Sequence, residues 1–110
     1  MNDFPLSIQA AIHYLQEQIT QNGVIVLFGS RVTRPFKKYA DFDIGLFMRK
    51  PLSWRTFSLW KTRVEELAWP YRIDLVDLAR APSEFLEVVR RHMCVLHGEW
   101  DNDDGFTRKT

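Results

Sequence analysis

Three short apolar segments most limit what this chain can fold into. The first, residues 24–28, is apolar throughout and rich in β-branched residues, which is typical of a strand buried on both faces. The other two, residues 42–48 and 71–77, are also mainly apolar, but Asp43 interrupts one and Asp74 interrupts the other. Three strands of this kind predict a small sheet at the centre of the fold.

Amphipathic helices are predicted around these strands. Apolar residues recur at three- and four-residue steps across residues 8–19, and residues 54–68 and 84–96 are also interpreted as helices. The predicted N-caps are Ser7, Ser53 and Ser83, and the predicted helix ends are Asn22-Gly23, Pro70 and Gly98. The order helix, strand, strand, helix, strand, helix predicts an α/β or α+β fold with a three-stranded mixed sheet flanked by helices.

The length of 110 residues fits a single domain, which we assign to residues 1–98, followed by a polar tail at 99–110. The formal net charge of +1 is low for a general nucleic-acid binder, so nucleic acid is not expected as a direct ligand. A tRNA that accepts a transferred group is left open. Cys94 is the single cysteine, and the N-terminal segment resembles neither a signal peptide nor a membrane span. These features predict a cytoplasmic protein.

A Gly-Ser pair directly follows the first strand. Gly29 lets the backbone turn sharply and approach a ligand closely. Ser30 offers a hydroxyl and free backbone amides where a helical turn begins, which is a favourable place for an anion. Arg31 adds a positive charge. We predict that these three residues bind phosphate groups; a plain strand-to-helix turn is the alternative explanation of the Gly-Ser pair.

Three aspartates are the candidate metal ligands. Asp41 and Asp43 are two residues apart, so on a strand they point to the same face. A divalent cation removes the repulsion between two such carboxylates, and oxygen ligands suit Mg²⁺. Asp74 joins the pair if the second and third strands are neighbours, and three carboxylates can hold two metals for phosphoryl-group chemistry. The alternative to metal binding is that Asp41 and Asp43 simply lie at a solvated strand end.

The combined motif resembles that of the minimal nucleotidyltransferases, which belong to the DNA polymerase β-like superfamily. It consists of Gly29-Ser30, then Asp41-Phe42-Asp43, then Asp74 within Ile73-Asp74-Leu75. The resemblance implies transfer of a nucleoside monophosphate, most simply AMP from ATP, to an acceptor hydroxyl. It implies that Asp41, Asp43 and Asp74 are the catalytic residues and hold Mg²⁺ or Mn²⁺. It implies that Gly29, Ser30 and Arg31 bind the nucleotide. It also implies a helical partner of the HEPN or substrate-binding type, whose tyrosine would be the acceptor, with this chain as the antitoxin.

The last predicted helix is apolar on more than one side, which predicts a protein–protein interface. Its candidate contact residues are Phe85, Val89 and Met93, with Trp100 beyond the helix. The rival interpretation, from another functional class, is a non-catalytic binding module that only masks its partner. Nucleotide turnover separates the two. Asp77 lies on the opposite strand face from Asp74, and we leave it out of the site as a residue that caps the next turn.

Overall fold

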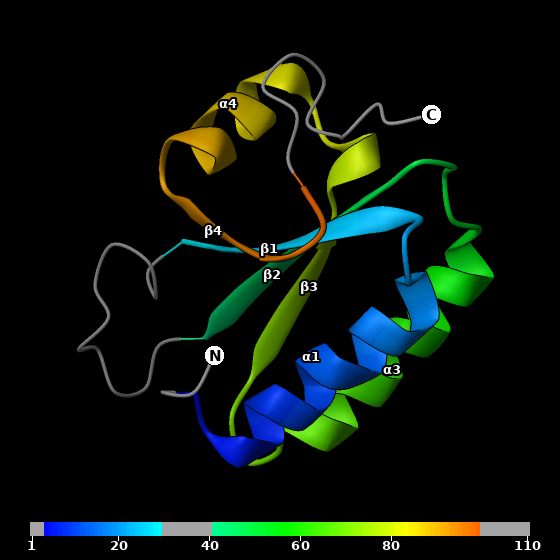
Figure 1. The fold of residues 1–110 in the computed structure, drawn as a ribbon, viewed down its shortest axis with the longest axis vertical. Helices are drawn as coiled ribbons and strands as arrows, with labels where there is room; N and C mark the ends of the chain where they lie inside the picture. The colour runs from blue at the N-terminus through cyan, green and yellow to red at the C-terminus, as the bar shows by residue number, and fades with distance from the viewer. Residues whose placement is uncertain (1–3, 30–40, 100–110) are drawn as a thin grey trace.

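The computed structural model describes residues 4–29 and 41–99 of this chain. Figure 1 shows a twisted four-stranded sheet with helices on both of its faces. The elements are α1 (Leu6–Ile19), β1 (Gly23–Phe28), β2 (Phe42–Met48), α3 (Trp54–Ala68), β3 (Ile73–Asp77), the short 3₁₀ helix η1 (Leu78–Arg80), α4 (Ser83–Arg91) and β4 (Met93–His97). The predicted α+β class with a mixed sheet is therefore confirmed.

The strand order is β3-β2-β1-β4. β1 pairs antiparallel with both β2 and β4, whereas β2 and β3 are parallel. Helices α1 and α3 cover one face of the sheet and form the larger core with it, while η1 and α4 cover the other face (Figure 1). Because both faces are covered, all of β1 except its last residue is buried, as its unbroken apolar sequence predicted.

The sheet has four strands, so the prediction of three was wrong. Residues 93–97 form β4, whereas the sequence pattern had assigned them to the end of a helix over residues 84–96. β1 is central and needs hydrogen-bond partners on both edges. β2 satisfies one edge, and β4 satisfies the other through pairs such as Val26 with Val95. A short apolar run does not by itself distinguish a strand from a buried helix segment.

This shorter helix changes the predicted interface residues. Val89 is 1% exposed and belongs to the core between α4 and the sheet, so it does not face a partner. Met93 lies on β4 and packs against the same core. Phe85 is partly exposed and contacts Phe28 edge-on, and Val88 is the more exposed apolar residue of α4. Trp100 lies outside the described residues.

Most helix boundaries differ slightly from the predicted ones. Helix α3 spans the predicted residues, and the Ser53 hydroxyl accepts a hydrogen bond from the Thr56 amide as its N-cap. Prolines occupy the N-cap positions of α1 and α4, so Ser7 and Ser83 are inside those helices rather than capping them. Helix α1 ends at Ile19, Thr20 follows with a positive φ of 49°, and Gly23 already starts β1. Gly98 follows β4 rather than ending a helix.

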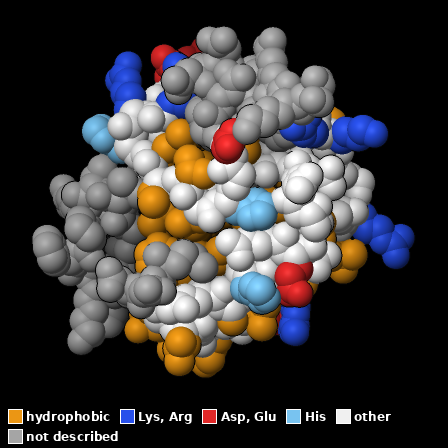
Figure 2. Space-filling view, in the orientation of Figure 1, with side chains coloured by type: hydrophobic (Ala, Val, Ile, Leu, Met, Phe, Trp, Pro, Cys, Tyr) orange, Lys and Arg blue, Asp and Glu red, His pale blue; other side chains and the backbone are white. Residues whose placement is uncertain are grey.

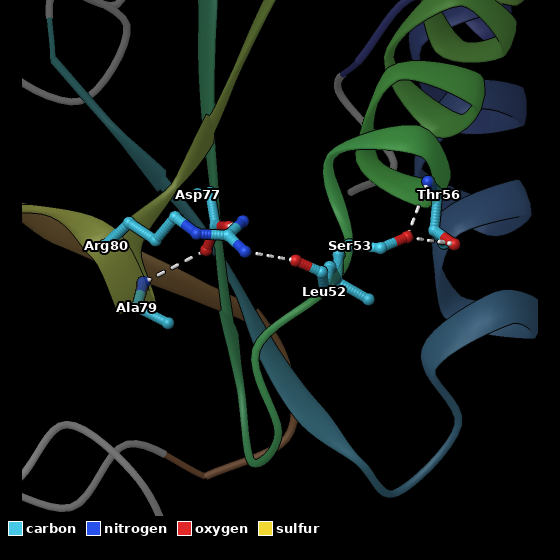
Figure 3. Close-up of polar contacts among 6 residues, drawn as sticks. All are labelled: Leu52, Ser53, Thr56, Asp77, Ala79 and Arg80. Atoms are coloured by element: carbon cyan, nitrogen blue, oxygen red, sulfur yellow. Dashed lines mark hydrogen bonds and ion pairs between the residues drawn. The ribbon is translucent and has the colours of Figure 1, made fainter.

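Asp77 has the capping role that its position predicted. Its carboxylate accepts a hydrogen bond from the Ala79 amide and pairs with the Arg80 guanidinium at 2.8 Å. Arg80 also donates to the Leu52 carbonyl, as Figure 3 shows, next to the Ser53 cap of α3. These contacts tie the end of β3 to the segment that enters α3. Among the described residues, no helix is both long enough and apolar enough to cross a membrane.

Candidate functional site

One end of the sheet brings together the candidate residues that are far apart in the sequence. β1 ends at Phe28, and because it is antiparallel to β2 its last residue pairs with Asp43 near the start of β2. β3 runs parallel to β2 in a register that places Asp74 beside Asp43. Neighbouring residues in register on adjacent strands share a face, so these two carboxylates point the same way. Asp41 comes directly before β2 and is exposed at the same end.

Gly29 lies against the Asp43 carboxylate. It has a positive φ of 77°, a conformation that favours glycine, and a Cβ atom placed there would be 2.1 Å from the nearer Asp43 oxygen. The sequence predicted a close backbone approach at this glycine, and the structure shows that Asp43 is the group approached. Ser30 and Arg31, the other predicted phosphate-binding residues, lie outside the described residues.

The carboxylates interact electrostatically. Burial raises the pKa of Asp43, and the negative charges of Asp74 and Asp41 raise it further. Asp74 is more exposed, and the Lys61 ammonium lies 4.0 Å from one of its oxygens. Three acidic groups close enough to affect one titration form a negative site that attracts cations.

The chemistry of this site fits a hard divalent cation. Carboxylate oxygens are the ligands that Mg²⁺ and Mn²⁺ prefer, and Mg²⁺ commonly takes one or two of them together with substrate phosphates. Asp43 and Asp74 are adjacent in register and can supply them. Within residues 4–29 and 41–99, no three His, Cys, Asp or Glu side chains already surround a common metal position.

A pocket of about 350 Å³ adjoins the carboxylates. All its lining residues come from α3, the segment between α3 and β3, the start of β3, and Asp41. They are Asp41, Lys61, Glu65, Trp69, Tyr71, Arg72, Ile73 and Asp74. Sequence reasoning about the site missed this pocket. The available signal was a tryptophan directly after a helix and five residues before a strand aspartate.

Comparisons with known proteins give consistent matches. Residues 9–99 match the family described as polymerase beta, nucleotidyltransferase. The probable protein adenylyltransferase MntA of Haemophilus influenzae is 30% identical over 87 residues, which are 79% of this chain and 76% of that protein.

Solved structures of toxin–antitoxin complexes share the fold. A chain of a toxin–antitoxin crystal structure with AMP-PNP matches with a TM-score of 0.70 and 25% identity, over 88% of this chain and 77% of that one. A chain from the complex of the tri-AMPylated Shewanella oneidensis HEPN toxin with MNT antitoxin has a TM-score of 0.66 and 24% identity, over 89% of this chain and 75% of that one, and supports the fold alone.

Proposed function

Because this chain belongs to the polymerase β nucleotidyltransferase family, we propose that it is a protein adenylyltransferase that transfers AMP from ATP to a hydroxyl of a HEPN-type partner protein. Its relative from Haemophilus influenzae is named a probable protein adenylyltransferase, and a toxin–antitoxin pair of the same fold was crystallised with AMP-PNP. In this proposal the chain is the antitoxin, and AMP transfer silences the partner. The single cysteine, Cys94, is exposed and free, which suits a reducing compartment such as the cytoplasm.

One observation carries the proposal: Gly29, directly after β1, lies against Asp43 on β2, and Asp43 is in register with Asp74 on β3, all at one end of the sheet. Asp41 and Asp43 would hold the divalent cation, Mg²⁺ or Mn²⁺, and Asp74 would complete the metal site. When bound, this cation neutralises phosphate charge and orients the entering and leaving oxygens. Gly29 leaves room for Asp43 beside the backbone, and with Ser30 and Arg31 it would position the triphosphate.

The proposed reaction is a single displacement at the α-phosphorus. The acceptor oxygen forms a bond to that phosphorus while the bond to the oxygen bridging the α- and β-phosphates breaks, and pyrophosphate leaves. Asp74 would take the proton of the acceptor hydroxyl, and its side chain, which is 58% exposed and lines the neighbouring pocket, supports this role. Asp43 is more enclosed, as expected of a residue that keeps its place through the reaction.

Position-specific labelling of ATP tests the proposal. The chain is incubated with Mg²⁺ and the protein encoded beside it, using ATP labelled at the α- or the γ-phosphate. Adenylyl transfer puts the α-label, and not the γ-label, on the partner. Asp43→Asn should abolish labelling, whereas Glu66→Gln, which removes an exposed acid from α3, should leave it unchanged. Labelling from the γ-phosphate would indicate a kinase, and tight partner binding with neither label would favour the non-catalytic binding module.

A further inference from the structure

We propose that the loop before α3 and the first turn of that helix bind single-stranded nucleic acid. Trp54 stacks on a base, and the cations around it contact phosphates of the strand. This surface, which we call the Trp54 surface, consists of one aromatic and four cationic residues, all exposed. They are Arg49, Lys50, Trp54, Arg55 and Arg80. The inference is independent of the proposed function.

The Trp54 surface lies at the opposite end of the sheet from the carboxylates. β2 begins beside the end of β1, where Asp43 pairs with Phe28, and it ends beside the start of β1, where Met48 pairs with Gly23. The loop that leads to α3 therefore leaves the sheet at the end far from Asp43. A strand bound to this loop leaves the nucleotide site open.

The first argument is that Trp54 is held in place and yet open to solvent. The Arg80 guanidinium lies over its ring, 4.6 Å from the centroid, and Phe57 packs edge-on against it with ring centroids 6.3 Å apart. Arg80 is itself fixed by its ion pair with Asp77 and by its hydrogen bond to the Leu52 carbonyl, as Figure 3 shows. Trp54 is still 66% exposed. A ring that is anchored on one side and open on the other can stack on a base without first being ordered.

The second argument is the charge around the ring. Lys50 and Arg55 form no ion pair with any Asp or Glu in the part of the chain that the structure describes, and the loop before α3 contains no acidic residue. The Asp77 side chain that pairs with Arg80 is only 5% exposed, so it adds little negative charge to the surface. The formal net charge of +1 therefore conceals a separation of charge, with the acidic site at the other end of the sheet. A local cationic surface attracts phosphates even when the whole chain is nearly neutral.

The third argument is the combination of the ring with the cations. Cations alone would suit an acidic protein segment equally well, but such a segment gives the open face of Trp54 nothing to stack on. A nucleic-acid duplex keeps the faces of its bases inside the stack, whereas a single strand can present them. Proteins that bind single strands combine cations along the backbone with aromatic rings under the bases. The Trp54 surface has both components, which favours a single strand over an acidic peptide or a duplex.

Fluorescence anisotropy with the full chain tests the assignment. The probes are labelled oligouridine and oligothymidine of about ten nucleotides, a length within the usual site sizes of single-strand binders. At least one of them should bind saturably, more weakly as salt rises, and equally well with saturating Mg²⁺–AMP-PNP; a preference between them identifies RNA or DNA as the ligand. Lack of saturable binding to both would overturn the proposal. Displacement by AMP-PNP would place the strand in the nucleotide site, and equal affinity for a polyglutamate peptide would make the surface a dock for acidic protein; either result also overturns it.

Two exposed tryptophans at opposite ends of α3 provide matched variants. Trp54→Ala should weaken oligonucleotide binding about tenfold, the effect of losing one stacked base, whereas Trp54→Phe keeps a ring and should retain most of the affinity. Trp69→Ala is the control, because Trp69 is 78% exposed but follows the far end of the helix. Unchanged binding by Trp54→Ala, or a loss in Trp69→Ala alone, would overturn the proposal.

The cations are tested through the salt dependence of binding, which remains informative if Trp54→Ala does not fold. Lys50→Met and Arg55→Met should each lower the slope of log affinity against log salt by about 0.7, the value for one phosphate contact with a single strand. Arg91→Met is the control with the same change of charge, since Arg91 is exposed at the end of α4, just before β4 pairs with the end of β1. Equal slopes in all three variants would show that the strand binds by general charge attraction and would overturn the assignment.

Discussion

Replacing Gly29 with alanine should disrupt the site by displacing Asp43. The new Cβ would be 2.1 Å from an Asp43 carboxylate oxygen, about 1.3 Å short of the 3.4 Å at which ordinary contact begins. Metal–ligand distances tolerate changes of only about 0.2 Å. The carboxylate must therefore move several times farther than a metal ligand can. The positive φ of 77° adds a backbone penalty of about 1–2 kcal/mol for any residue with a Cβ.

Two assays follow these effects separately. For Gly29→Ala, calorimetry should show a large loss of Mg²⁺–AMP-PNP affinity, and the α-label assay should show a large loss of AMP transfer. Urea unfolding should show a moderate loss of stability. Gly98→Ala is the control, since Gly98 has a similar φ of 81° but lies beside Gly23, at the opposite end of β1. It should lose stability while retaining nucleotide affinity wherever it remains folded.

A double-mutant cycle isolates the contact with Asp43. In an Asp43→Ala background, the stability cost of Gly29→Ala should shrink to the backbone penalty, because the clashing carboxylate is gone. Near-normal nucleotide affinity and transfer in Gly29→Ala would refute the reasoning. Additive stability costs in the cycle would show that the new methyl group does not press on Asp43.

Three further substitutions test the packing and charge of the fold. Arg80→Met should lower the free energy of unfolding by about 1–3 kcal/mol, because it removes the ion pair of the nearly buried Asp77. An unchanged Tm in thermal unfolding would contradict this. Gly45→Ala places a Cβ 2.5 Å from Leu78 and should lower the free energy of unfolding in urea by about 1–3 kcal/mol. The loss should be smaller in a Leu78→Ala background, and equal losses would show that Leu78 is not the obstacle. The raised pKa of Asp43 means that the folded chain binds that proton more tightly than the unfolded chain, so in EDTA stability should fall as pH rises from 3.8 through the raised pKa. Asp43→Asn should remove that fall in pH-dependent urea titrations, and its persistence would assign it to other groups.

Local sequence patterns were sufficient to predict several helices and strands. Strand β2 and helix α3 have the predicted bounds, because their apolar periodicity and the Ser53 cap act over a few neighbouring residues. The same local chemistry singled out Gly29 as a place where the backbone comes close to another group. The aspartates stood out because a charge in an apolar strand requires compensation.

Tertiary contacts decided what local patterns could not. Residues 93–97 became β4 because the free edge of β1, more than sixty residues earlier in the chain, needed hydrogen-bond partners. The placement of Asp74 beside Asp43 depends on the parallel register of β2 and β3, which the α3 crossover brings together. The pocket next to them combines α3, β3 and Asp41. The sequence by itself determined which residues are the candidates for the site, whereas their neighbours were decided by strand pairings that only the assembled sheet specifies.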